Sequence, residues 1–208
     1  MKQDVFAVIL AGGSGTRFGG DVKKQFLTFH GKELWRHIYD TVIDLLPADH
    51  VIVVGVDITG GQTRSESVKN GLDWVYRKGG CRKVICLEAA RALVTHEQLQ
   101  KIIELDSPSC CFVNPVVDTV ILTDKTYLTR AECRHLVSPQ AFDFELLYKA
   151  YERCDLSEIR TDETRLMYDT YGIKPDFLDG GENLYKVTYP KDLAVLEEIY
   201  RQMQENKA

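Results

Sequence analysis

An unbroken apolar run, Val5 to Leu10, is followed at once by Ala11, Gly12 and Gly13. A run this short and this apolar is typical of a strand buried on both faces, as in a parallel sheet. The glycines that follow leave backbone N–H groups open to a phosphate chain, because no Cβ obstructs the approach. The start of the chain therefore predicts an α/β fold whose first strand opens into an anion-binding turn.

Strand-like and helix-like segments alternate along most of the chain, which indicates βαβ units and a mostly parallel sheet with helices on both faces. After Asp118 this rhythm breaks, and residues 119–135 predict a protruding β-arm. We expect one domain over residues 1–208. The expected strands are 5–10, 51–56, 83–87, 110–117 and 184–188, and the expected helices are 33–46, one that begins near Thr63, 95–105, 144–151 and 190–203.

Composition restricts the partners of the chain. Of its 208 residues 44% are hydrophobic, and its formal net charge is -5 with both signs mixed along the length. This pattern argues against a surface that binds nucleic acid or an anionic membrane, because such a surface needs clustered Lys and Arg. No apolar stretch reaches the ~18 residues of a membrane span, and residues 1–4 do not resemble a signal peptide. The six cysteines show no C-x-x-C spacing, so we expect reduced thiols and a cytoplasmic protein.

The glycine-rich turn continues to Gly15 and is followed by two cations, Arg17 and Lys24. Fixed cations on either side of a triphosphate would stabilise charge that develops on a phosphoryl group. A Walker loop would end in Gly-Lys-Ser/Thr, which is absent here, and a dinucleotide fingerprint would need a glycine where Phe18 stands. The remaining alternative is a plain glycine turn with solvated side chains.

At this point the chain resembles the 2-C-methylerythritol 4-phosphate cytidylyltransferases and the related ribitol-5-phosphate cytidylyltransferases. The similarity consists of short motifs in the family's order: Gly-Ser-Gly-Thr-Arg before Lys24-Gln-Phe, residues 60–68, Glu88-Ala-Ala-Arg91, Asp118-Thr119, Arg130, Ser138-Pro-Gln-Ala-Phe142, Thr161-Asp-Glu163 and Lys186-Val-Thr188. The resemblance implies a single-domain Rossmann-like nucleotidyltransferase fold and the transfer of CMP from CTP to a sugar-alcohol phosphate.

The resemblance also implies roles for individual residues. The catalytic cations would be Arg17, Lys24 and Lys186. The nucleotide would lie against Ala11, Gly12, Gly13, Gly15, Gly61, Arg64 and Ser67. The acceptor would lie among Glu88, Arg91, Thr119, Arg130 and Ser138. A Mg2+ ion on the phosphates is expected, with Glu88 as one candidate ligand, and the arm would reach across a homodimer into the neighbouring site.

Departures from the family pattern leave the acceptor open. Lys23 replaces a proline, Glu88 replaces an aspartate, and the segment between Val56 and Gly60 is short, so a helix is expected to be missing there. We expect methylerythritol phosphate as acceptor, in isoprenoid precursor synthesis. Ribitol phosphate or another polyol phosphate for teichoic acid or capsule is the alternative. A non-catalytic nucleotide-binding paralogue is the alternative from another class.

Some of these residues also have a purely structural interpretation. Lys186 lies in a strand-like pattern in which a lysine would usually face solvent. For Asp162 and Glu163 we favour the structural interpretation, a helix N-cap followed by a first-turn charge.

Overall fold

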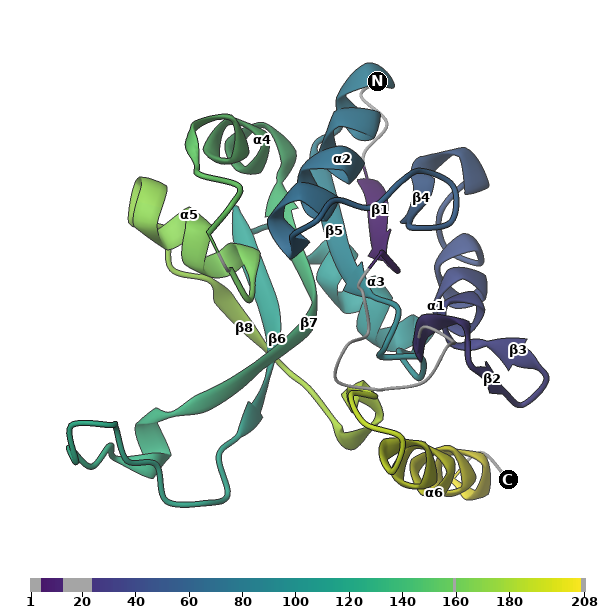
Figure 1. Ribbon diagram of the computed structural model, residues 1–208, viewed down its shortest axis with the longest axis vertical. Helices are drawn as coiled ribbons and strands as arrows, with labels where there is room; N and C mark the ends of the chain where they lie inside the picture. Colours follow the sequence, from purple (N-terminus) through teal and green to yellow (C-terminus); the bar gives the residue numbers. More distant parts are fainter. Residues whose placement is uncertain (1–4, 13–23, 159, 207–208) are drawn as a thin grey trace.

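The computed structural model describes residues 5–12, 24–158 and 160–206, and six strands of this part form one sheet in the order β4-β1-β5-β7-β6-β8 (Figure 1). They are β1 (Val5–Leu10), β4 (Val51–Val54), β5 (Lys83–Glu88), β6 (Ser109–Pro115), β7 (Arg134–Asp143) and β8 (Asp176–Asp179). β1 runs parallel to β4 and β5, and β6 runs parallel to β8. β7 is antiparallel to both of its neighbours. The expected mostly parallel sheet is confirmed.

Helices cover both faces of this sheet (Figure 1). On one face lie α1 (Leu34–Ile43) and α3 (His96–Glu104), and on the other lie α2 (Arg64–Arg77), α4 (Phe144–Arg153) and α5 (Glu163–Tyr171). Side chains of β1 alternate between the two cores: Ala7 and Ile9 pack with α1, whereas Phe6 and Val8 pack with α2. This two-sided burial explains the continuous apolar run of β1. Among the described residues, every helix is too short or too polar to cross a membrane.

The helix starts follow the capping residues in the sequence. Thr63 caps α2 by accepting from Glu66 N, and Thr95 forms a complete capping box with Gln98 at the start of α3. Asp162 caps α5 by accepting from Arg165 N, as expected from the structural interpretation. Such caps satisfy backbone N–H groups that have no partner inside the helix.

A third, smaller core joins three parts of the chain that lie far apart in sequence. It unites the hairpin β2 (Thr28–Phe29) and β3 (Lys32–Glu33), the loop after β5, and the last helix, α6 (Asp192–Glu205). Its buried members are Phe29, Leu34, Ala92, Leu93, Val187, Leu196 and Ile199. Because Val187 is fully buried in this core, the backbone next to Lys186 is held against α6 and the loop after β5.

The predicted strand 184–188 is wrong. Leu184 ends the short 3-10 helix η4 (Glu182–Leu184), and residues 185–188 have no regular structure. The apolar residues that suggested a strand are buried in two different clusters, Leu184 in the core with α1 and α3 and Val187 in the third core. The edge of the sheet beside β6 is instead occupied by β8, a strand that the sequence did not predict.

The longest of the described strands, β7, was also not predicted, and it contains Pro139, a residue that is disfavoured in a central strand. The register explains how the proline is accommodated. β6 pairs Cys111 with Gln140 and then Phe112 with Val137, so the pairing is irregular at Pro139. The ladder with β5 reaches Gln140 and stops there. No strand on either side therefore needs an N–H from Pro139.

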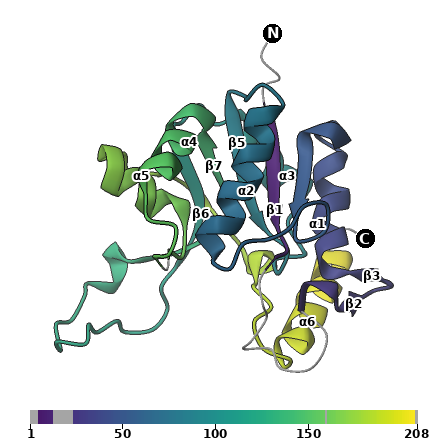
Figure 2. The same ribbon diagram turned by 45° about the horizontal axis from the view of Figure 1, so that its top comes forward.

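The predicted arm is confirmed as an excursion from the sheet. Between β6 and β7 the chain leaves the sheet and its helices and returns through the 3-10 helix η3 (Arg130–Glu132), as Figures 1 and 2 show. A single bridge joins Ile121 and Tyr127 within the arm. Large apolar side chains of the arm face solvent, with Val117 and Tyr127 each 72% exposed.

All six cysteines are free thiols, as expected.

Gly55 offers a test of how tightly the loops after β1 and β4 approach each other. It has φ +100, and a Cβ there would lie 2.6 Å from backbone atoms of Gly12. Gly79 has the same φ with open space around it. We expect Gly79→Ala to lower the free energy of unfolding by about 1–2 kcal/mol through backbone strain alone. Gly55→Ala should cost more, because it adds a steric clash. Equal losses in urea unfolding would contradict the close approach.

Candidate active site

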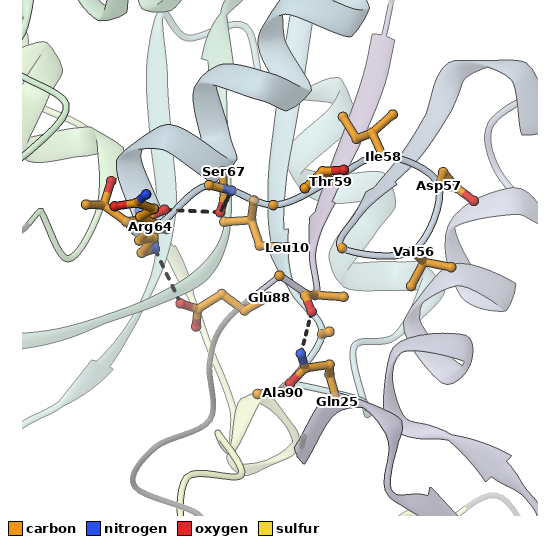
Figure 3. Close-up of a pocket in the computed structure, with 18 of the residues that line it drawn as sticks. Leu10, Gln25, Val56, Asp57, Ile58, Thr59, Arg64, Ser67, Glu88 and Ala90 are labelled. Atoms are coloured by element: carbon orange, nitrogen blue, oxygen red, sulfur yellow. Dashed lines mark hydrogen bonds and ion pairs between the residues drawn. The ribbon is translucent and has the colours of Figure 1, made fainter. Parts of the chain in front are cut away.

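A cavity of about 900 Å³ lies where the parallel strands β4, β1 and β5 end (Figure 3). Its walls are the ends of β1 and β5, the segment from Gly55 to Arg64, and Lys186. β1 lies between β4 and β5 in the sheet, and the chain passes from β1 to β4 on one side before it reaches β5 on the other. Ligands of open α/β sheets bind where the strand order reverses in this way. The cavity is therefore the first candidate for a ligand site.

One wall of the cavity is made of backbone in close contact. A Cβ on Gly60 would lie 3.0 Å from Gly12 Cα, so these two glycines let the loops after β1 and β4 touch. Ser67 Oγ accepts from Gly61 N at 3.0 Å and donates to Thr63 O at 3.1 Å. The predicted nucleotide residues Ala11, Gly12, Gly61, Arg64 and Ser67 all line this cavity.

The loop between β4 and α2 is short and contains no helix, as expected from the sequence. It folds back on its own strand: Gly55 N donates to Ile58 O at 2.7 Å, and Val53 N donates to Asp57 Oδ2 at 2.9 Å. Asp57, Ile58 and Thr59 line the cavity, although the sequence analysis gave them no role (Figure 3). Their position directly after a buried strand is the signal that could have identified them.

Gln25 is a second residue whose role was missed. It is only 3% exposed, and its side-chain Nε2 donates to Ala11 O at 2.5 Å (Figure 3). This bond ties the 3-10 helix η1 (Lys24–Phe26) to the end of β1. η1 begins at Lys24, whereas the predicted residues Gly13, Gly15 and Arg17 lie outside the described residues, as does Lys23.

Glu88, at the end of β5, is the centre of a charge cluster. Its Oε1 accepts from Lys186 Nζ at 2.8 Å, and its Oε2 lies 3.3 Å from Arg91 Nε. Arg64 Nε lies 3.7 Å from Glu88 Oε1 (Figure 3). One carboxylate thus brings together three cations that come from distant parts of the sequence.

The cluster determines the charge of Glu88. Burial by itself would raise the pKa of this carboxyl, but the positive charges of Lys186, Arg91 and Arg64 outweigh it and lower the pKa to about 2. Glu88 is therefore an anion at neutral pH. Three cations, Lys186, Arg91 and Arg64, face two carboxylates, Glu88 and the Glu163 that pairs with Arg64, so these side chains carry an excess of one positive charge, which favours an anionic ligand.

Arg64 also connects the cavity to the interior. Its guanidinium forms two hydrogen bonds with Glu163, whose side chain is fully buried, and Tyr151 Oη donates to the same carboxylate at 3.0 Å. Burial opposes the charge on Arg64, yet the paired Glu163 raises its pKa further above its ordinary value. Glu163 lies in the first turn of α5 as expected, but it also anchors Arg64.

The predicted acceptor residues lie in two places. Arg91 contacts Glu88, donates to Leu184 O and lines a second, mostly apolar cavity of about 720 Å³, which it shares with Lys186. Ser138 is 5% exposed on β7, and its Oγ has no hydrogen-bond partner among the described residues. Gln140 pairs with Cys86 in the antiparallel ladder, so Ser138, two residues before Gln140, and Glu88, two residues after Cys86, lie towards the same end of the two strands.

The other predicted acceptor residues are on the arm. Arg130 donates from Nη1 to Val117 O at 2.9 Å, and both Thr119 and Arg130 are exposed. Neither lines either of the two cavities of its own chain. The fold therefore does not bring them together with Glu88 and Lys186 of the same chain.

A protein cage for a metal is not formed by the described residues, which contain no group of three or more His, Cys, Asp or Glu that could hold an ion. Glu88, the candidate ligand, has one oxygen on Lys186 and the other facing Arg91. The other acid among the described lining residues, Asp57, accepts a backbone hydrogen bond from Val53 N. These side chains do not fit a resident Mg2+, whose preferred ligands are free oxygens.

The chain is similar to known proteins over nearly its whole length. The family model for 2-C-methyl-D-erythritol 4-phosphate cytidylyltransferase matches residues 5–202. A relative of that name from Bacteroides thetaiotaomicron is 32% identical and covers 94% of this chain and 98% of its own length. Another, from Caldicellulosiruptor bescii, is 31% identical and covers 93% and 96%.

Solved structures agree with the fold. The bifunctional IspDF from Campylobacter jejuni superposes with a TM-score of 0.80 at 29% identity, and the match covers 93% of this chain and 54% of that longer chain. The 4-diphosphocytidyl-2C-methyl-D-erythritol synthase from Anaerococcus prevotii gives a TM-score of 0.78 at 22% identity, covering 96% and 99%.

The charge of Glu88 gives a pH-dependent stability. Because its pKa falls from 4.5 to about 2 on folding, the ionised carboxylate stabilises the fold fully above pH 4.5, and this contribution is lost as the pH falls towards 2. We expect the difference in free energy of unfolding between wild type and Glu88→Gln to be constant from neutral pH down to pH 4.5 and to shrink as the pH falls further towards 2.

Urea unfolding over this pH range measures the difference. Glu145→Gln is the matched control, since Glu145 pairs with Lys149 on the surface, and it should change stability by less than about 0.5 kcal/mol. A Glu88→Gln difference that grows as the pH falls would contradict the assignment.

Proposed function

This chain belongs to the 2-C-methyl-D-erythritol 4-phosphate cytidylyltransferase family, and we propose that it transfers CMP from CTP to the phosphate of 2-C-methyl-D-erythritol 4-phosphate. Pyrophosphate is the second product, and the reaction belongs to isoprenoid precursor synthesis. The single observation that carries the proposal is the cluster of Lys186, Arg91 and Arg64 around Glu88, at the edge of a cavity lined by glycines.

The glycine wall supports the nucleotide half of the proposal. Gly12, Gly60 and Gly61 line the cavity with backbone alone, and we propose that the base lies against this wall. Backbone N–H groups would read the keto position of cytosine, and Ser67 Oγ, whose proton is donated to Thr63 O, would accept from the amino group, so uracil would leave buried polar groups unpaired. We propose Gly13, Gly15, Arg17 and Lys24 for the triphosphate, with the two cations on the leaving pyrophosphate.

The chemistry needs no protein nucleophile. An oxygen of the acceptor phosphate attacks the α-phosphorus of CTP in line with the leaving oxygen, the new P–O bond forms, and the bond to the β-phosphate breaks. Lys186 neutralises the charge that develops on the α-phosphate, as positioned cations do in phosphoryl transfer. Arg91 binds the acceptor phosphate, because its guanidinium fork matches two oxygens. Ser138 lies towards the same end of the sheet as Glu88.

We propose that Mg2+ enters with CTP, as part of the substrate. The described residues offer it no protein cage, and the phosphate oxygens of CTP supply the hard ligands that it prefers. When bound, it neutralises phosphate charge. Glu88 instead holds Lys186 and Arg91 in position.

We propose a homodimer in which the arm of one copy completes the site of the other. Thr119 and Arg130 lie on the arm, away from the cavities of their own chain, and the arm exposes Ile121, Tyr127 and Leu128 to solvent. Exposed apolar side chains in such number are typical of a surface that another chain covers. Residues 1–208 act as one catalytic domain in each copy.

A panel of acceptors tests the function. We expect pyrophosphate release from CTP with 2-C-methyl-D-erythritol 4-phosphate, and much less with UTP. Faster release with ribitol 5-phosphate would replace the acceptor and leave the nucleotide chemistry intact. CTP binding without turnover on any polyol phosphate would indicate a non-catalytic paralogue.

Removal of the Lys186 ammonium should mainly affect the chemical step. We expect Lys186→Ala to lower kcat by about 10²- to 10³-fold, because one charge contact on the transition state is lost. Steady-state kinetics of pyrophosphate release measure the effect. Lys174→Ala, which changes an exposed lysine before β8, is the control and should leave kcat unchanged. An unchanged kcat in Lys186→Ala would overturn this mechanism.

Mixing two inactive variants tests the shared site. In a heterodimer of Arg130→Ala and Lys186→Ala chains, one site receives both an intact Lys186 and an intact Arg130. Unfolding and refolding an equal mixture should therefore restore about one quarter of the wild-type sites. Each variant refolded alone is the control and should stay inactive. No recovery in a mixture that size-exclusion chromatography shows to be dimeric would mean that Arg130 serves its own chain.

A further inference from the structure

The segment that carries Lys186 is not held by the sheet. Residues 185–188 lie between η4 and α6 without regular structure. A backbone hydrogen bond from Val187 N to Ala90 O at 2.9 Å joins the middle of this segment to the loop after β5. A lysine on such a segment needs further contacts to fix its position.

Asp192, in the first turn of α6, supplies contacts on both sides of Lys186. Its Oδ2 accepts from Thr188 N and from Tyr189 N, each at 2.8 Å. Its Oδ1 accepts from Tyr185 Oη at 3.0 Å. The side chain is 4% exposed, so these bonds are shielded from water.

From this geometry we propose that Asp192 is a positioning residue for Lys186. Its carboxylate binds the residue before Lys186 and the two backbone amides that follow Val187, so it sets the path of the segment and thereby the place of the ammonium. The inference rests on the proposed function, in which Lys186 neutralises the α-phosphate.

The same helix holds the segment in two ways. Leu196 of α6 is buried in the third core with Val187, and Asp192 binds the backbone directly after Val187. Packing holds the Val187 side chain against α6, while the Asp192 carboxylate holds the backbone amides of Thr188 and Tyr189. Displacement of a reacting group by about 1 Å can cost on the order of 10²-fold in rate, so a loosened segment should slow the chemical step more than it weakens CTP binding.

The experiment compares two substitutions at this position by steady-state kinetics of pyrophosphate release. Asp192→Ala removes all three bonds and should lower kcat at least tenfold, with KM for CTP changed less than about threefold. Asp192→Asn keeps an oxygen for the two N–H donors and can donate to Tyr185 Oη, so it should restore kcat to within about threefold of wild type. Rescue by asparagine separates hydrogen-bonded positioning from a simple effect of charge.

A double-mutant cycle tests whether Asp192 acts through Lys186. In a Lys186→Ala background, Asp192→Ala should cause no further loss of kcat. The matched control is Asp143→Ala, which removes another carboxylate that caps a helix start, here by accepting from Leu146 N. That position lies away from Lys186, so kcat should stay unchanged even if the melting temperature falls. If Asp192→Ala does not fold, Tyr185→Phe removes one of the three bonds and should lower kcat severalfold.

Backbone amide exchange measured by NMR provides a readout that does not depend on turnover. In Asp192→Ala the amides of Thr188 and Tyr189 should exchange faster, while those of β5 stay protected. Unchanged exchange of these two amides would overturn the inference, as would additive losses in the Lys186→Ala background. A wild-type protein that turns over no acceptor would instead overturn the proposed function, and amide exchange would still test the role of Asp192.

Discussion

The site depends on one buried anion. Glu88 is placed by β5 at the end of the sheet, and Lys186, Arg91 and Arg64 reach it from separate parts of the chain. A buried carboxylate is costly unless it is paired, and three cations in one place would repel each other without an anion between them. The carboxylate and the cations therefore stabilise one another.

This arrangement has a functional consequence. Catalysis of phosphoryl transfer depends mainly on charges that are already in place when the transition state forms. The ion pair of Arg64 with the fully buried Glu163 extends the cluster into the core beneath α5. Asp192 of α6 accepts from the backbone amides of Thr188 and Tyr189, shortly after Lys186. Arg64 and the segment that carries Lys186 are thus each tied to a helix, α5 and α6 respectively.

Backbone contact shapes the rest of the cavity. Gly12, Gly55 and Gly60 meet without side chains between them, and the loop from β4 to α2 is short enough to lie directly on the end of β1. The proposed nucleotide wall therefore depends on the absence of Cβ atoms, whereas the proposed acceptor side depends on charged side chains. The two halves of the proposed reaction are held by different physical means.

Local patterns in the sequence determined the buried strands β1 and β5, the capped helices α2 and α3, the arm and the glycine wall, because apolar periodicity and capping chemistry act over a few residues. They did not determine β7, whose Pro139 is tolerated only because neither neighbouring strand pairs with it. Nor did they reveal that residues 185–188 are irregular, that Glu88 contacts Lys186 and Arg64, or that Glu163 contacts Arg64. These ion-pair partners lie far apart in sequence, and only tertiary packing brings them together.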